Sequence, residues 1–356
     1  MLTPHSPKDP NQRIVPAAIE HATTINVTQI FEERIEECQR AQGAGDTAAA
    51  LRLAQALFSD AGLLKSTDRA LFMRICSVCT QVAFSLGAVD EAEVYALSGV
   101  SAAREKLSVP EYAEPYAALV NALALVYDRR GESEMGLYAL RDAQKRIETA
   151  QLEVPILRIT MRYNEALLLS HKERYAEAAR IASHVVDALQ PTSQLAADNQ
   201  DLRFNALALY ADLLFKIGEY QQITDTWQAH IESCVPWWGS ALLWLATHAT
   251  LGAGLSDHIS VSREAANRGL ELVTDNAEGC YCGALLHLGR GVALAASSLV
   301  ESARGELDRF VEGTREVGED MAPGMRQLAR GFIRTVLKRH APREHIEGLL
   351  AGIPDY

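Results

Sequence analysis

A pair of short helices joined by a tight turn recurs along this chain, and that recurrence constrains the fold more than any other feature. The clearest copy covers residues 121–143, where Leu123 and Tyr127 are spaced to share one helical face. Gly131 supplies the turn, and Gly136 on the second helix is small enough to let the two helices pack closely. This stretch therefore predicts an antiparallel helix pair.

Equivalent turns follow one another at a nearly constant spacing. The predicted turns lie at Gly87, Gly131, Glu173 and Gly218, so successive turns are 42 to 45 residues apart. Prolines mark the joins between pairs, where a residue that cannot continue a helix is expected. These are Pro110, Pro155, Pro191, Pro236 and Pro323. A fixed period of this length is typical of a solenoid.

From this spacing we predict an all-α solenoid of about six to seven antiparallel helix pairs. Residues 1–22, which contain four prolines and no helical periodicity, are expected to form a flexible leader. Residues 23–320 are expected to form the helical-repeat domain. Residues 321–356 are expected to form C-terminal capping helices, because terminal repeats must cover an exposed core.

The composition favours a helical fold and argues against one class of function. Hydrophobic residues make up 48% of the chain and aromatic residues only 6%, because Ala and Leu, which favour helices, are abundant. A formal net charge of -12 argues against general nucleic-acid binding, which needs clustered Lys and Arg. A chain of 356 residues with six cysteines and no recognisable signal peptide favours a cytoplasmic protein.

The segment 233–256 contains no charged residue and includes Trp237, Trp238 and Trp244. A membrane span needs about 20 predominantly apolar residues. Pro236 and several Gly, Ser and Thr residues interrupt this segment, so we predict a buried central helix and no membrane span. The tryptophans are expected to anchor the core, with docking of a second subunit, as in a homodimer, as the alternative.

The repeated helix pairs resemble the tetratricopeptide repeat (TPR). The residues that carry the resemblance are Leu123, Ala124, Tyr127, Gly131 and Ala143 in the clearest pair, Gly87 and Ala92 in an earlier pair, Ala166, Tyr175 and Ala178 in the next pair, and Ala211, Gly218 and Tyr220 in the one after it. The period exceeds the motif's 34 residues by about one helical turn per helix, which is similar to the longer repeats of bacterial peptide-sensing regulators. The resemblance implies a right-handed superhelix whose concave surface is lined by the first helix of each pair.

Three asparagines, Asn121, Asn164 and Asn205, occur on these first helices. An amide offers donors and an acceptor, which suits recognition of a peptide backbone. In the peptide-sensing regulators that the chain resembles, similarly placed asparagines hold an extended peptide. The alternative is that these side chains are solvated or cap local backbone. The other residues predicted to line the concave surface are Arg74, Gln81, Asp128, Arg129, Tyr163, His171, Asp212 and Lys216.

A basic stripe lies near the C-terminus. Arg326, Arg330, Arg334 and Lys338 are spaced by four residues, which places them on one helical face. Like charges at this spacing repel each other by a few tenths of a kcal/mol per pair. The stripe is therefore interpreted either as a cap that docks on the acidic solenoid or as a surface that binds an acidic partner or nucleic acid.

Metal binding and catalysis have little support in the sequence. Cys76 with Cys79 and Cys280 with Cys282 are spaced like zinc ligands, but the two pairs are several repeats apart, and a closed zinc site needs four converging ligands. We expect buried cysteines and no metal. No nucleophile, Walker or dinucleotide-binding motif occurs, so we expect neither a cofactor nor an enzymatic activity.

The sequence thus predicts a non-enzymatic, regulatory helical-repeat protein that binds a peptide or protein segment in its concave groove. The alternative is a peptide-sensing transcriptional regulator that contacts DNA or an acidic partner through the basic C-terminal helix.

Overall fold

The computed structural model describes residues 27–103, 109–234, 239–318 and 320–354. Within these ranges the chain is helical and contains no strand, as predicted. The predicted leader at 1–22 and the residues Trp237 and Trp238 lie outside the described residues. The boundary predicted between residues 320 and 321 remains a prediction.

The helices form two layers. The inner layer consists of α1 (Val27–Gly43), α4 (Arg69–Ser85), α6 (Ala113–Arg129), α8 (Pro155–His171), α11 (Gln200–Ile217), α13 (Ser240–Leu255), α15 (Ala277–Ala296) and α17 (Ala322–Leu337). The outer layer consists of α2 (Thr47–Ala61), α5 (Val89–Ala103), α7 (Ser133–Thr149), α9 (Tyr175–Ala188), α12 (Tyr220–His230), α14 (Ile259–Leu270), α16 (Val300–Val317) and α18 (Arg343–Leu350). Short helical turns connect some of them: α3 (Leu64–Thr67), η1 (Pro110–Tyr112), α10 (Gln194–Asp198) and η2 (Ile231–Cys234).

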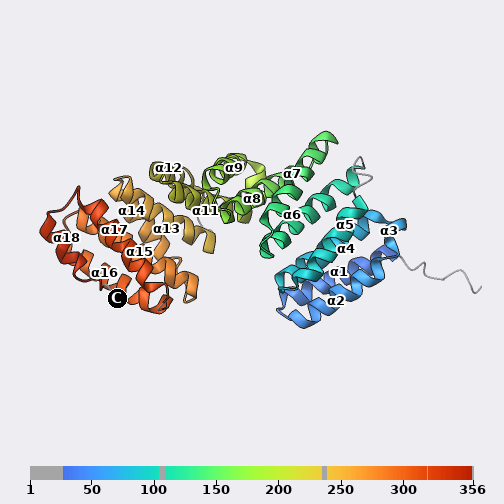
Figure 1. Cartoon of the computed structure of the whole chain (residues 1–356), viewed down its shortest axis with the longest axis horizontal. Coiled ribbons are helices and arrows are strands. Elements are labelled where there is room, and N and C mark those ends of the chain that lie inside the picture. Colours follow the sequence, from blue (N-terminus) through green and yellow to red (C-terminus); the bar gives the residue numbers. More distant parts are fainter. Residues whose placement is uncertain (1–26, 104–108, 235–238, 319, 355–356) are drawn as a thin grey trace, which may run out of the picture.

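The contacts between helices are those of a solenoid. Each inner helix packs against the next inner helix, and each outer helix before α18 packs between its own inner helix and the following one. The pairs therefore follow an arch, with α9 and α12 on its outer side and α8 and α13 toward its inside (Figure 1). Seven pairs precede α17 and α18 in the described part of the chain, which agrees with the predicted architecture.

The turns within pairs lie where the sequence predicts them. Gly87, Gly131 and Gly218 have φ values of 77°, 79° and 82°, a left-handed conformation that glycine adopts without steric cost. Glu173 takes the same position in its pair with a φ of 58°. A Cβ on Gly136 would lie 2.8 Å from the carbonyl oxygen of Ala124, so this glycine does permit the close helix packing expected from the sequence.

Helix α13, from the uncharged segment, is buried along most of its length. Its buried residues include Leu242, Leu243, Leu245, Ala246, Ala249 and Ala253. Among the described residues no helix has the length and apolar character needed to cross a membrane.

The C-terminal end of the solenoid is wound more tightly than the rest. Helix α17 contacts α13 as well as its neighbours α15 and α16. Gly254 on α13 permits this, because a Cβ there would lie 2.8 Å from the ring of Phe332. A hydrogen bond between His340 and Asp257 joins the ends of the same two helices.

Candidate binding surface on the concave face

The inner helices present their solvent-facing residues to the concave side of the arch, where described residues line an acidic and an apolar hollow. The first is a cavity of about 630 Å³ between α1, α4 and the start of α6. Its polar lining consists of Glu32, Glu36, Gln39, Arg74, Ser77, Gln81, Glu111 and Glu114, and Ile35, Val78, Pro115 and Ala118 complete it. We call this hollow the acidic groove.

Helical spacing positions the residues of the acidic groove. Glu32, Glu36 and Gln39 are four and then three residues apart on α1, so they share one face, beside the stripe of buried residues that includes Phe31. Arg74 and Gln81 are seven residues apart on α4 and share its face in the same way. The structure places both at this hollow, as the sequence predicted, whereas the glutamates were missed. The polar stripe on α1 was the signal that could have revealed them.

The groove carries an excess of negative charge. Arg74 binds Glu32 through two contacts, with nitrogen–oxygen distances of 2.6 and 3.1 Å. Glu36, Glu111 and Glu114 are exposed and form no ion pair with another described residue. Carboxylates without a partner attract Lys and Arg side chains.

Uncharged hydrogen-bonding groups also lie in the acidic groove. The amides of Gln39 and Gln81 are exposed, and each can donate and accept hydrogen bonds. Ser77, which is 8% exposed, also places a hydroxyl on the lining of the groove.

The predicted ladder of three asparagines is not formed, and this corrects the sequence interpretation. Asn121 and Asn164 are 6% and 4% exposed, and the Asn164 amide donates to the side-chain oxygen of Asn121 over 3.0 Å. Asn121 in turn donates to the carbonyl of Leu157 over 3.4 Å. The two side chains therefore join α6 to α8. Asn205 is exposed on α11, and its contact with a peptide remains a prediction.

Arg129 and His171, also predicted to face the concave surface, bind neighbouring parts of the protein. The guanidinium of Arg129 lies 4.2 Å from the ring centre of Phe84 and donates to the Phe84 carbonyl over 3.0 Å. His171 Nδ1 lies 2.7 Å from a carboxylate oxygen of Asp128, whose other oxygen accepts from Ser133 over 2.7 Å. These contacts link adjacent inner helices.

Asp212 and Lys216 are brought together on α11. Lys216 Nζ lies 2.8 Å from Asp212, and His248 on α13 lies 3.3 Å from the same carboxylate. Burial raises the pKa of Asp212, but hydrogen bonds and charges from His248 and Lys216 outweigh burial and hold the pKa below its ordinary value. Lys216 also lies over the ring of Tyr175, 5.0 Å from its centre.

Aromatic side chains that the sequence analysis did not assign to a site surround this ion pair. Trp244 stacks on His248 with ring centres 5.8 Å apart, and Tyr281 packs against Trp244 at 5.7 Å. Tyr163, a predicted concave residue, is half-buried, and burial raises its pKa. The spacing of Trp244 and His248 by four residues was the available signal.

The second hollow on the concave side, which we call the apolar pocket, measures about 490 Å³. It lies between α11, α13 and α17 and is lined by Phe215, Leu251, Leu255, Gly324, Gln327, Leu328, Gly331, Phe332 and Thr335. The lining contains no charged side chain. The pocket exists because α17 turns back toward α13.

The predicted basic stripe on α17 is only partly a surface, which is a second correction. Arg326 is 9% exposed, and Arg330 donates to the carbonyl of Ile353. Arg334 and Lys338 are exposed. Because α18 and the residues after it pack beside α17, they cover one end of the stripe.

Four of the five cysteines whose side chains are described are buried in the core, whereas Cys280 is half-buried. Cys76, Cys79 and Cys282 are fully buried, and burial raises the pKa of Cys76 and of Cys282 to about 12. The Cys79 thiol donates to the Ala54 carbonyl over 3.3 Å. In the part of the chain that the structure describes, no group of three or more His, Cys, Asp or Glu side chains is arranged to hold a metal.

Comparisons with known proteins identify a fold. No protein-family model matches the sequence, and no curated protein matches it. The apo form of the quorum sensor NprR from B. thuringiensis is 12% identical, with a TM-score of 0.51 over 91% of this chain and 86% of that chain. A tetratricopeptide repeat protein from Parabacteroides merdae is 15% identical, with a TM-score of 0.46 over 91% of this chain and 99% of its own.

The apo form of RapI is 11% identical to this chain, with a TM-score of 0.48 over 90% of this chain and 99% of RapI. At these identities the likeness shows the fold alone. That fold is the TPR-like solenoid of long repeats that the sequence resembles.

Proposed function

We propose that this protein is a non-enzymatic, regulatory binding protein that holds a basic peptide, or a basic segment of another protein, in the acidic groove. The observation that carries this proposal is the combination of a hollow of about 630 Å³ with three carboxylates, on Glu36, Glu111 and Glu114, that no described residue neutralises. Such a site favours Lys and Arg side chains.

The uncharged groups of the acidic groove suit the backbone of the same ligand. The Gln39 and Gln81 amides can each donate to a peptide carbonyl and accept from a peptide N–H. They would add hydrogen bonds that do not depend on the ligand's side chains, while the carboxylates select its charge. The neighbour NprR is a quorum sensor, and its fold supports a sensing role for this chain as well.

DNA contact through α17, the alternative function, has less support. Arg334 and Lys338 are the exposed members of the stripe, because Arg326 is buried and Arg330 donates to the Ile353 carbonyl. We therefore keep peptide binding as the conclusion.

The test measures binding of fluorescein-labelled peptide pools by anisotropy. One pool is rich in Lys and Arg, and the other has the same lengths with Glu and Asp. We expect the basic pool to bind the wild-type protein, and the variant Glu36→Lys with Glu114→Lys to weaken that binding at least about tenfold.

A matched variant controls for net charge. Glu37→Lys with Glu312→Lys reverses two exposed carboxylates outside the groove and changes the total charge by the same amount. It is expected to bind the basic pool almost as the wild type does. Equal losses in both variants would mean that overall charge, not the acidic groove, attracts the peptides, and the proposal would be wrong.

A further inference from the structure

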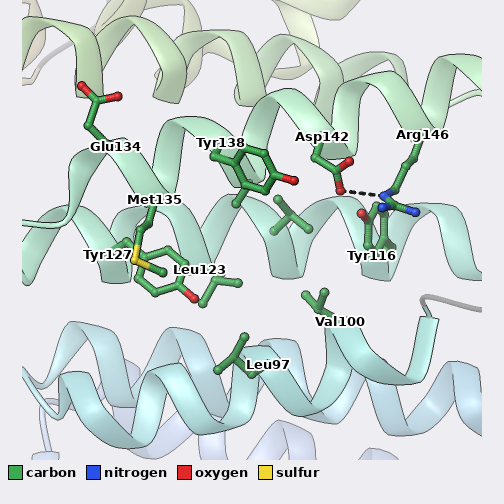
Figure 2. A pocket seen from close by; sticks show the side chains of 12 residues that line it. Leu97, Val100, Tyr116, Leu123, Tyr127, Glu134, Met135, Tyr138, Asp142 and Arg146 are labelled. Atoms are coloured by element: carbon green, nitrogen blue, oxygen red, sulfur yellow. Dashed lines mark hydrogen bonds and ion pairs between the residues drawn. The ribbon is translucent and has the colours of Figure 1, made fainter.

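A second groove lies on the outer side of the solenoid, away from the concave face. Helices α5 and α7 both pack on α6. They form the walls of this groove, and α6 forms its floor (Figure 2). The groove encloses about 460 Å³ and runs along α7 from Glu134 to Arg146. At 1.5 Å per residue this length is about 18 Å, or roughly three helical turns. We call it the outer groove.

The walls of the outer groove expose large apolar side chains. Leu97 on α5 is 42% exposed, and Met135 and Tyr138 on α7 are 51% and 74% exposed. Leu123 and Tyr127 form a buried apolar floor beneath them (Figure 2). Apolar residues gathered in a hollow, rather than scattered singly, are typical of an interaction surface.

Negative charge gathers at one end of the outer groove, where α5 and α7 begin. The guanidinium of Arg130 is shared by three carboxylates: it bonds to Glu93 and lies 3.4 Å from Asp90 and 3.6 Å from Glu132. Glu134 adds a fourth, 3.9 Å from Arg174. Arg174 in turn binds Glu177. Acidic groups therefore outnumber basic ones at this end.

The charges around Tyr127, at the Glu134 end of the groove, differ from those at the Arg146 end. Burial raises the pKa of Tyr127 on the groove floor, and the charges of Glu93 and Glu132 raise it further, while the charge of Arg130 lowers it. At the other end, Arg146 binds Asp142 over 2.6 Å. That pair balances itself, so the excess charge belongs to the end marked by Glu134.

We propose that the outer groove binds an amphipathic α-helix of a partner protein, with apolar residues on one face and Lys or Arg side chains at the end that meets Glu134. A helix places apolar residues at i, i+4 and i+7 on one stripe, and that stripe fits between Leu97 on one wall and Met135 and Tyr138 on the other (Figure 2). The basic end is selected by the unbalanced carboxylates. The net charge of -12 adds long-range attraction for a basic helix. This site is independent of the acidic groove.

The probes are two fluorescein-labelled synthetic helices with the same leucine stripe. One carries a run of lysines at its C-terminal end, and the other carries glutamates there. We expect the lysine helix to bind the full chain at least about tenfold more tightly than the glutamate helix. The variant Leu97→Ser with Tyr138→Ser should weaken binding of the lysine helix by about tenfold or more.

The matched control is Leu63→Ser with Leu299→Ser, which removes two exposed leucines, 82% and 48% exposed, from other parts of the surface. It should leave binding of the lysine helix unchanged. Circular-dichroism melting of both variants checks that they fold. Binding that survives the groove variant, or fails altogether, overturns the proposal. Self-association in analytical ultracentrifugation that is lost only in the groove variant also overturns it, since the occupant would then be a second copy of this chain.

Discussion

The acidic groove and the apolar pocket lie on the same inner layer of helices, yet they offer opposite chemistry. In the acidic groove, α1, α4 and α6 present glutamates and glutamines. In the apolar pocket, α11, α13 and α17 present leucine and phenylalanine. The helix packing differs too, because α17 reaches past α15 to contact α13, whereas among the described helices α6 makes no comparable contact with α1 across α4.

The difference shows how one repeat pattern supports two surfaces. The turn glycines and the buried Ala and Leu positions define the solenoid, and they leave the solvent-facing inner positions free to vary. The absence of a side chain at Gly254 then permits α17 to approach α13 closely. A tight winding excludes water and suits apolar side chains, while an open one leaves room for charged groups.

The largest effect is expected from Phe332→Ala. Phe332 is 5% exposed and packs against Gly254, so its removal leaves a cavity where α17 meets α13. The free energy of unfolding should fall by about 3 to 5 kcal/mol, measured by urea denaturation. Leu328→Ala, in the same pocket but 38% exposed, should cost much less. Equal costs would show that α17 does not depend on this contact.

The next prediction concerns the asparagine pair between the two regions. Asn164→Ala leaves the Asn121 side-chain oxygen buried without its donor, which should cost about 1 to 3 kcal/mol of stability. Binding of basic peptides to the acidic groove should not change, because neither amide lines it. A loss of affinity with unchanged stability would restore the original interpretation of these residues as peptide ligands.

Salt should weaken ligand binding at the acidic groove much more than at the apolar pocket. Raising the NaCl concentration from about 0.05 to 0.5 M shortens the Debye length several-fold, so the affinity of basic peptides for the acidic groove should fall by about tenfold. An apolar dye that binds the apolar pocket should respond weakly, and Leu328→Lys should lower its fluorescence. Anisotropy and fluorescence titrations measure the two responses. Similar salt dependence at both sites would show that charge does not distinguish binding at the acidic groove from binding at the apolar pocket.

The local features of the fold were predictable because they depend on single residues. Glycine turns, proline breaks and apolar periodicity are encoded within one helix pair, and the turn at Gly131 lies where it was expected. The tight winding at α17 was not predictable, since it depends on how Gly254 and Phe332, 78 positions apart in the chain, pack together.

Whether each asparagine is buried or exposed depends on its position along its helix relative to the neighbouring repeat. Asn121 is the ninth residue of α6 and Asn164 the tenth of α8, so adjacent inner helices bring the two amides together. Asn205 is the sixth residue of α11, about one turn earlier, and it stays exposed. Helix boundaries derived from sequence are uncertain by a few residues. The exposed Asn205 differs from the two buried asparagines by only three to four helix positions, so the sequence could not distinguish them.

The smallest expected effect is the contribution of Asp212 to the pH dependence of protein stability. Asp212 lies on α11 beside the apolar pocket. Its pKa is lower in the folded protein than its ordinary value of about 3.9, because His248 and Lys216 outweigh the effect of burial. The stabilisation is therefore complete above that ordinary value and is lost as the pH falls through the folded pKa. Asp212→Asn should flatten the decline of the melting temperature below about pH 4, whereas Asp201→Asn, an exposed carboxylate on the same helix, should leave it unchanged. An equal decline in wild type and Asp212→Asn would show that this cluster does not stabilise the junction between α11 and α13.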